Sequence, residues 1–415
     1  MPQQPATKTG PKQGAAKRAP AKQVSGKTPK ARKTVANGTS PGKPTRGRTA
    51  LDLNGYLYSP ADIPMRRVRV DFHHHDRLDT IDEPMRGDIS GMAIDDDILW
   101  LVSDETCSVE RLKRQDDGGY GAHRSFDLTK VFDLPGNTEI DLEGMAVEDD
   151  WLWLVGSHAL KRKKPRPDQD GARKTIKRLG RIEREANRYF LARVPLETGV
   201  DGAPELVATA RDGREAGLVR MRKGRNDLAR HLAKDPHIGP FLDIPAKENG
   251  IDIEGIAVSG TRVFLGLRGP VLRGMSLMIE LDIKDKGDGR LKLRKTFNDG
   301  GRYRLHFLEL GGMGIRDMVM DGTRLLLLVG PTMDLDGPVA VVSLKEPFGD
   351  FHDVTFAKEI GHVLRIPHGA GTDHAEGFAL TPDHEVLVAH DSPDPSRLHD
   401  DSRAKDLDLF ALETA

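Results

Sequence analysis

The chain has 415 residues, of which 37% are hydrophobic, 31% are charged and 44 are glycine. This glycine and turn content is too high for a helical bundle, and no run approaches the roughly 18 consecutive apolar residues of a membrane span. The single cysteine, Cys107, excludes an intramolecular disulfide and a cysteine zinc site. No apolar export segment follows the cationic N-terminus, so we expect a cytoplasmic protein without a membrane span.

The first 50 residues differ sharply in composition from the rest. They contain 12 Lys or Arg and no Asp or Glu, whereas acidic residues outnumber basic ones by 13 in the remaining 365. Because large apolar side chains are almost absent, burial cannot offset the ordering entropy, and we predict a disordered basic tail over residues 1–50. Such a tail predicts weak, sequence-blind contact with nucleic acid. A merely solubilising tail is the alternative.

After an alternating segment at residues 66–73, one phrase recurs five times along the chain. Each copy starts with a polar residue, runs as a short apolar strand, turns, and returns as a dense apolar strand. This pattern predicts a β-hairpin that is buried on both faces. The copies are DISGMAIDDDILWLVSDE from Asp88, DLEGMAVEDDWLWLVGSH from Asp141, DIEGIAVSGTRVFLGLRG from Asp252, GIRDMVMDGTRLLLLVGP from Gly314 and DHAEGFALTPDHEVLVAH from Asp373.

Repeats of this length are typical of β-propeller blades, which have four antiparallel strands each. The residues taken as equivalent are Ser90, Glu143, Glu254, Asp317 and Glu376. Five blades fit these positions, and a sixth, degenerate blade near residues 200–250 is the alternative. The last repeat has room for only three strands, so residues 66–73 are predicted to supply its fourth. We predict an all-β, monomeric protein with a single propeller domain over residues 51–415.

Two insertions lengthen the second repeat. Residues 161–188 hold 12 basic and four acidic residues. Their helically spaced apolar residues are Ile176, Leu179, Ile182 and Ala186. Residues 212–240 hold a second predicted helix, with Asn226 or Asp227 as its N-cap. We expect both insertions on one face of the propeller, either as a basic lid that steers anionic ligands inward or as a solvated helical hairpin.

Four phrases in the second half of the chain resemble a bacterial family catalogued as a domain of unknown function. They are NGIDIEGIAV at 249–258, LGLRGPVLRG at 265–274, LELGGMGIRDM at 308–318 and VGPTMDLDGPVA at 329–340. The resemblance covers roughly residues 65–412, and the family is similar in outline to phytase-like and esterase-like propellers. It implies a propeller fold but no activity, substrate or catalytic residues, so the function has to be argued from the site.

Hairpin topology gathers polar residues at one mouth of the central channel. The start of an innermost strand and the end of the second strand lie at the same end of a blade. The aspartates placed there are Asp88, Asp104, Asp141, Asp252 and Asp391. The predicted metal ligands share the equivalent repeat position and are Glu143, Glu254, Asp317 and Glu376. The residues predicted to hold a substrate anion and to transfer protons are Arg268, Arg316, His158 and His390.

Carboxylates gathered this closely need a cation, a bound arginine or raised pKa values to coexist. We expect a divalent metal, Ca²⁺ first, and no organic cofactor. The sequence predicts a metal-dependent hydrolase that acts on an anionic small molecule, either a phosphoester or a lactone. The alternative is a non-catalytic propeller that binds a ligand or a protein, in which these polar residues serve turn geometry and are solvated by channel water.

Overall fold

The computed structural model describes residues 53–72, 85–136, 138–166, 168–297, 300–345, 353–399 and 403–412. The chain divides into two units, residues 1–49 and 50–415, and all described residues belong to the second unit. The predicted basic tail over residues 1–50 therefore lies outside the described residues. Within the described ranges, no helix has both the length and the apolarity needed to cross a bilayer.

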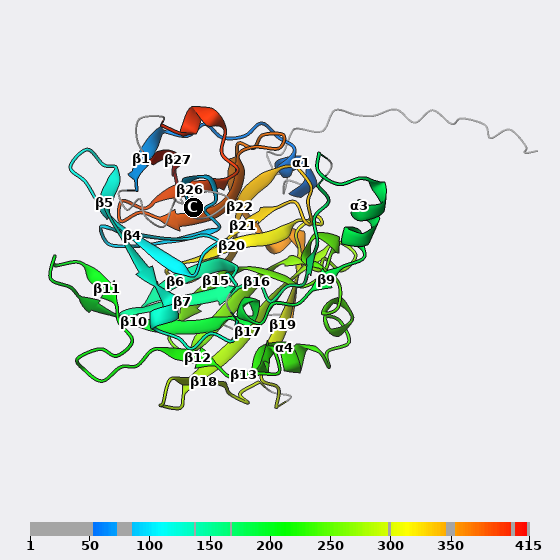
Figure 1. Cartoon of the computed structure of the whole chain (residues 1–415). Coiled ribbons are helices and arrows are strands. Elements are labelled where there is room, and N and C mark those ends of the chain that lie inside the picture. The colour runs from blue at the N-terminus through cyan, green and yellow to red at the C-terminus, as the bar shows by residue number, and fades with distance from the viewer. Residues whose placement is uncertain are drawn as a thin grey trace, which may run out of the picture. The chain divides into compact units, whose positions relative to one another are not determined.

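In each of the five repeats, further strands, mostly antiparallel, extend the hairpin into a sheet that we call a blade (Figure 1). Blade one contains β2 (Gly91–Asp95), β3 (Ile98–Val102), β4 (Ser108–Arg114) and β5 (Tyr120–Asp127). Blade two contains β6 (Leu142–Glu148), β7 (Trp151–Gly156), β10 (Leu191–Thr198), β11 (Pro204–Leu206) and β12 (Gly217–Val219). Blade three contains β15 (Asp252–Ser259), β16 (Arg262–Gly269), β17 (Met275–Asp285), β18 (Arg290–Leu293), β19 (Arg304–Glu309) and β23 (Val354–Thr355).

The last two blades are regular. Blade four contains β20 (Gly314–Asp321), β21 (Arg324–Gly330), β22 (Val339–Lys345) and β24 (Gly361–Ile366). Blade five contains β25 (His374–Leu380), β26 (Glu385–Asp391) and β27 (Ala404–Ala411) from the C-terminal repeat. Its fourth strand is β1 (Arg66–Asp71), which pairs antiparallel with β27 over its whole length. The predicted completion of the last blade by the N-terminal strand is therefore confirmed.

The innermost strands form a closed ring. Strands β2, β6, β15, β20 and β25 contact one another in sequence order, and β25 contacts β2. The buried apolar residues of the described chain fall into five clusters, each between two neighbouring blades. Sheets packed radially in this way make a β-propeller, as the repeats predicted. Within the described part of residues 200–250, the strands are short additions to blade two or the small hairpin β13 (Met221–Arg222) and β14 (Arg225–Asn226), which favours five blades over six.

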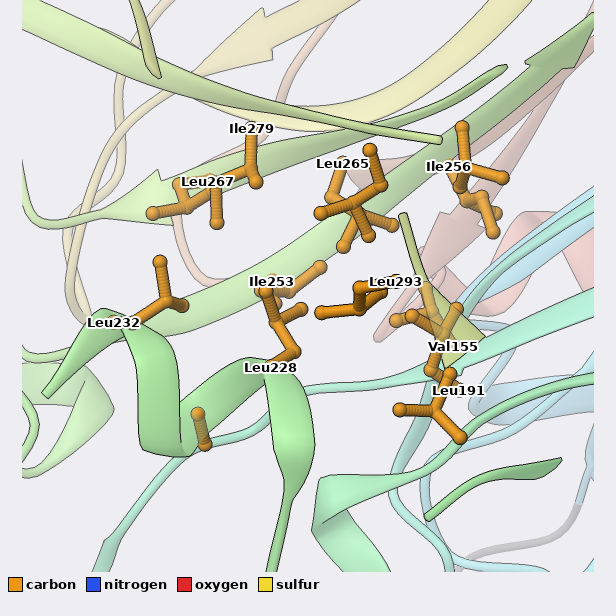
Figure 2. Packing of buried hydrophobic residues seen from close by; sticks show 14 of the residues in the cluster. Val155, Leu191, Leu228, Leu232, Ile253, Ile256, Leu265, Leu267, Ile279 and Leu293 are labelled. Atoms are coloured by element: carbon orange, nitrogen blue, oxygen red, sulfur yellow. The ribbon is translucent and has the colours of Figure 1, made fainter. Parts of the chain in front are cut away.

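The cluster between blades two and three also holds the helix of the second insertion (Figure 2). Helix α4 (Asp227–Leu232) begins after Asn226, whose side chain accepts a hydrogen bond from the Ala229 amide at 2.9 Å. Leu228 and Leu232 are fully buried against Ile253 of β15 and its neighbours. Helix α1 (Leu53–Leu57) similarly packs into the cluster between blades three and four. The predicted cap and helix of residues 212–240 are confirmed.

The first insertion does not form the single amphipathic helix that the spacing of its apolar residues predicted. Helix α3 (Ala172–Leu179) stops before Gly180, and the chain continues as β9 (Ile182–Glu183), which pairs with β8 (Lys161–Arg162). Ile182 therefore belongs to a strand. None of the α3 residues is buried, so the spacing of apolar residues marked a helix but not a packed face.

Candidate metal centre at the channel mouth

A β-bulge interrupts the inner strand of blades two to five close to the channel mouth. In each case the pairing with the second strand skips one residue, which is Glu143, Glu254, Arg316 or Glu376. A bulge re-aims the side chain of the residue that it leaves unpaired. The residue after each bulge returns to the ladder and is Gly144, Gly255, Asp317 or Gly377.

This register corrects the alignment of the fourth repeat. Arg316, not Asp317, occupies the position held by Glu143 and Glu254, and Asp317 occupies a position that is glycine in the other bulged blades. The sequence alignment placed the carboxylate of Asp317 opposite the carboxylates of the other repeats. When the repeats are aligned by the backbone position of the bulge, the fourth blade has an arginine where the neighbouring blades have a glutamate.

Glycine suits the position after the bulge because inner strands of adjacent blades approach closely there. A Cβ on Gly144 would lie 2.8 Å from the carbonyl oxygen of Glu254. Asp317 instead uses its side chain: one carboxylate oxygen accepts from the Met318 amide at 2.7 Å and the other from the Phe378 amide of β25 at 2.9 Å. Burial raises the pKa of the Asp317 carboxyl well above its ordinary value. Asp317 therefore joins blades four and five through both of its carboxylate oxygens.

We expect Asp317→Ala to lower the free energy of unfolding by roughly 2–3 kcal/mol, because it leaves a buried inter-blade amide without its acceptor. Urea denaturation of the two proteins measures this difference. Divalent cation affinity should be unchanged in the variant. A variant as stable as the wild type would contradict the joining role, and a selective loss of metal affinity would restore Asp317 to the ligand set.

The carboxylates that do converge come from blades one, two and three. Two groups have ligand oxygens that all lie within 4.8 Å of one another, and they share Glu143. The first group is Asp104, Asp141 and Glu143, and the second is Glu143, Asp252 and Glu254. We call these five residues the acidic centre. One buried oxygen of Asp104 and one of Glu254 have no hydrogen-bond partner among the described residues.

The crowding and burial of the acidic centre raise its pKa values. Burial raises the pKa of Glu254 to about 8, although the charge of Arg268 lowers it. Burial likewise raises the pKa of Asp141 to about 6, although the charge of Arg188 lowers it. Burial also raises the pKa of Glu143 and of Asp104 well above their ordinary values, and neighbouring carboxylates add to both shifts. Without a cation, the centre therefore holds protons near neutral pH.

In the presence of a chelator, we expect stability to fall as pH rises from about 4.5 to about 8. The pKa of Glu254 is about 8 in the folded chain, whereas the ordinary pKa of a glutamate is 4.5, so the folded state binds the proton more tightly than the unfolded state. This stabilisation is lost as the pH rises through the folded-state pKa. Glu254→Gln should remove roughly 3 kcal/mol of this pH dependence, since one pKa unit corresponds to about 1.4 kcal/mol and neighbours share the titration. Urea denaturation at pH 5, 6.5 and 8 measures it; identical pH dependence in both proteins would contradict it.

Three arginines neutralise part of the mouth. Arg188 pairs with Asp141. Arg268 donates to Asp252 at 2.6 Å and lies 2.7 Å from Glu254, and Arg316 pairs with Glu376. Burial favours a higher pKa for Glu376, but Arg316 and Arg268 outweigh it and lower that pKa, so this glutamate is held as an arginine partner outside the acidic centre.

The two predicted proton-transfer histidines are enclosed by protein. The Nδ1 of the buried His158 donates a hydrogen bond to the Gly156 carbonyl at 2.8 Å, so its Nε2 accepts one from the Asn226 side-chain amide at 2.7 Å. Burial lowers the pKa of His158 to about 4. His390 is fully buried, 3.7 Å from Asp408, and burial assisted by Arg397 lowers its pKa to about 3. Both stay neutral and enclosed. Strand position predicted their neighbourhood, but the positive φ of His158 and the packing of blade five turn them inward.

Two further titratable groups lie on the blade-five side of the mouth. Burial raises the pKa of the partly exposed Asp391 to about 7, with Glu376 and Asp88 adding to the shift. Lys405 is fully buried, its Nζ donates to the His390 carbonyl, and burial lowers its pKa to about 7. Neither Lys405 nor Arg188 was predicted from the sequence; a lysine near the start of the C-terminal strand was the only signal for the former.

The repeats, the bulges and the acidic centre lie within the region matched by one family model. The match spans residues 88–405, and the family is described as "Protein of unknown function (DUF3616)". The chain belongs to the DUF3616 family. This confirms the resemblance noted from the four phrases of the second half. No curated protein matches this DUF3616 chain.

Several solved structures are similar to this DUF3616 chain at low identity. Glutaminyl cyclase from Myxococcus xanthus is 9% identical, with a TM-score of 0.36 over 85% of this chain and 100% of that chain. A gluconolactonase from Xanthomonas campestris is 11% identical, with a TM-score of 0.34 over 86% and 99%. The WD40 β-propeller domain of Doa1 is 8% identical, with a TM-score of 0.33 over 85% and 98%. At these values the comparisons carry no argument about function.

Proposed function

We propose that the protein is a metal-dependent hydrolase of an anionic phosphoester or lactone, with its reaction centre at the channel mouth. The observation that carries this proposal is the sharing of Glu143 between two carboxylate groups whose oxygens lie within 4.8 Å. The unpartnered buried oxygens of Asp104 and Glu254 support it. Such oxygens are costly in a folded protein, and a cation coordinated by them would remove that cost.

The donor set fits a hard divalent cation. All five side chains of the acidic centre offer carboxylate oxygens, which suit Ca²⁺, Mg²⁺ or Mn²⁺ rather than a thiolate-preferring metal. Arg188 and Arg268 compensate two of the five negative charges, which leaves an excess of three. The three blades that contribute would surround the cation from one side, and Ca²⁺ suits such a flexible, oxygen-rich set.

When bound, the cation would supply Lewis acidity to the substrate's carbonyl or phosphoryl oxygen. We propose Asp391 as the group that accepts and returns a proton, because it is partly exposed and has a pKa of about 7. The guanidinium groups of Arg268 and Arg316 form ion pairs with carboxylates of the protein. We therefore assign these two arginines to neutralising the protein's own charge, not to holding the substrate anion. The exposed Lys247, which is close enough to Arg268 and Glu376 for their charges to affect its pKa, would meet the substrate anion instead.

Hydrolysis of p-nitrophenyl phosphate and of an aliphatic δ-lactone by the full chain, with Ca²⁺, Mg²⁺ or Mn²⁺ and with chelator, tests the proposal. We expect metal-dependent turnover of at least one substrate, and a loss of about 100-fold in kcat for Asp391→Asn with metal affinity retained. Asp383→Asn is the matched control, since Asp383 is an exposed residue that pairs with Arg114.

Chelator-insensitive hydrolysis would contradict the metal requirement, and full activity of Asp391→Asn would contradict the proton role. A protein that binds the metal but hydrolyses neither substrate would favour the alternative of a ligand-binding propeller.

A further inference from the structure

The insertion at residues 160–188, which we call the basic lobe, is held by ion pairs instead of an apolar core. The side chain of Asp170 is fully buried and pairs with Lys174 and Arg178 of α3, at 2.5 and 3.3 Å. Arg178 also donates to the Lys164 carbonyl at 2.8 Å. Helix α3 projects beyond the sheets in Figure 1. The helix is therefore fixed in place without burying any of its own residues.

The apolar residues of the basic lobe face solvent. Ile176 is 70% exposed, Leu179 41% and Ile182 46%. Ten large apolar residues are exposed in the described chain, and three of them fall within these seven positions, so the concentration is local. Ile176 and Leu179 are three residues apart and share one face of α3, whereas Lys174 and Arg178 lie on the side turned to Asp170.

Unpaired cations border this apolar face. Arg173 and Lys177 lie along one side of it on the helix, where successive residues are 100° apart. Five exposed residues of the lobe form no ion pair with a described residue, namely Lys164, Arg166, Arg173, Lys177 and Arg181. The lobe that exposes three aliphatic side chains thus also carries five cations without an ion pair to a described residue.

The basic lobe is attached beside the channel mouth. Arg162 at its base pairs with Glu248, and Leu160 forms a backbone bridge with Pro245. Lys247, from the same turn, reaches Asp334 at 3.2 Å, and Asp334 also experiences the charges of Lys164 and Arg268. A surface bound by the lobe would therefore lie next to the acidic centre.

We propose that the basic lobe docks on an anionic lipid surface. Lys and Arg side chains would contact lipid phosphates while Ile176, Leu179 and Ile182 enter the boundary between head groups and acyl chains. A nucleic acid would satisfy the cations but offers no apolar medium for the aliphatic side chains, and the lobe has no aromatic residue that could stack on bases. The basic tail of the same chain is a second cationic segment, which would add electrostatic attraction to an anionic surface. The inference does not depend on the hydrolase proposal.

Bilayer insertion can be measured with a tryptophan placed at the apolar face of α3. In full-length Ile176→Trp, vesicles containing 30% anionic phosphatidylglycerol should shift the emission to the blue, and bromine-labelled acyl chains should quench it. Vesicles of phosphatidylcholine alone and duplex DNA should do neither. Val200→Trp is the matched control, because Val200 is fully exposed between β10 and β11 and lies outside the lobe. The native Trp100 and Trp153 are buried, and the half-buried Trp151 is covered by Arg193 outside the lobe, so the three give a constant background.

A charge variant separates the lobe from the tail. Replacing Arg173 and Lys177 with Gln should weaken vesicle affinity by about 10-fold or more, since each cation near an anionic surface contributes several-fold. Replacing Lys284 and Lys286 on the β17 to β18 hairpin with Gln should change it by less than about 2-fold. Vesicle binding without quenching at position 176 would overturn the proposal in favour of tail-only tethering. An emission shift with DNA but not with vesicles would overturn it in favour of nucleic acid.

Discussion

Replacing Glu143 with Gln is expected to reduce divalent cation affinity by at least about 10-fold while the fold remains intact. Glu143 belongs to both carboxylate groups of the acidic centre, and its side chain forms no hydrogen bond or ion pair with a described residue. A cation would favour its ionised form, whose oxygens could then bind the cation without any protein partner losing a contact. Isothermal titration with Ca²⁺, Mg²⁺ and Mn²⁺ measures the affinity. At a cation concentration of 100 Kd, the wild type should gain about 2.7 kcal/mol of stability.

Glu376→Gln is the matched control for this substitution. Glu376 occupies the same bulge position in blade five but is paired with Arg316 and lies outside both carboxylate groups. We expect its removal to change cation affinity by less than about 3-fold, as a longer-range charge effect. Equal losses in both variants would mean that total charge, not the shared position of Glu143, controls binding. No binding by the wild type would refute the metal centre.

Deletion of residues 2–72 is expected to prevent folding of the propeller, whereas deletion of residues 2–50 should change Tm by less than about 2 °C. The longer deletion removes β1, which pairs with six residues of β27, and exposes the edge of blade five together with the cluster around Val68 and Val70. The tail has almost no large apolar side chains to contribute to the body. Circular dichroism and size-exclusion chromatography measure both outcomes.

Point substitutions in β1 address the same closure without removing chain. Val70 is fully buried, so Val70→Asp should cost roughly 3 kcal/mol or more, while Arg67→Asp at an exposed position of the same strand should cost under about 1 kcal/mol. A shorter truncation must also spare Leu53, which is 3% exposed in the cluster between blades three and four. Equal stability of the two deletions would contradict closure by β1.

The fold was predictable because the hairpin repeats carry their own signal. Dense apolar second strands such as residues 98–102 and 151–155 occur at blade-like intervals, and strand alternation at Val68, Val70 and Phe72 identified the closing strand. These features depend on local periodicity, which a sequence displays directly. The position of α4 was equally readable, because Asn226 is a good N-cap and Leu228 and Leu232 are one turn apart.

The candidate site was predictable as a neighbourhood but not residue by residue. Glu143 and Glu254 were correctly brought together, because they share the position at which the bulge re-aims a side chain. Asp317 was misplaced by one position, since a bulge leaves no unique mark in the sequence. The burial of His158 and His390 depends on tertiary packing around each, which residue type and strand position do not encode.

The side chains at the bulges make the channel mouth asymmetric, although the ring of inner strands is nearly symmetric. Their backbone is alike in blades two to five, yet the side chains differ: glutamates in blades two and three, an arginine in blade four, and a glutamate bound to that arginine in blade five. In blade one, the corresponding Ser90 hydroxyl donates to the Leu142 carbonyl at 2.6 Å. The bulge residues that belong to the acidic centre thus lie in two adjacent blades, two and three. Exchanging bulge side chains between blades would move these carboxylates around the axis while every strand kept its pairing, so a nearly symmetric scaffold can direct its chemistry to a chosen part of the mouth.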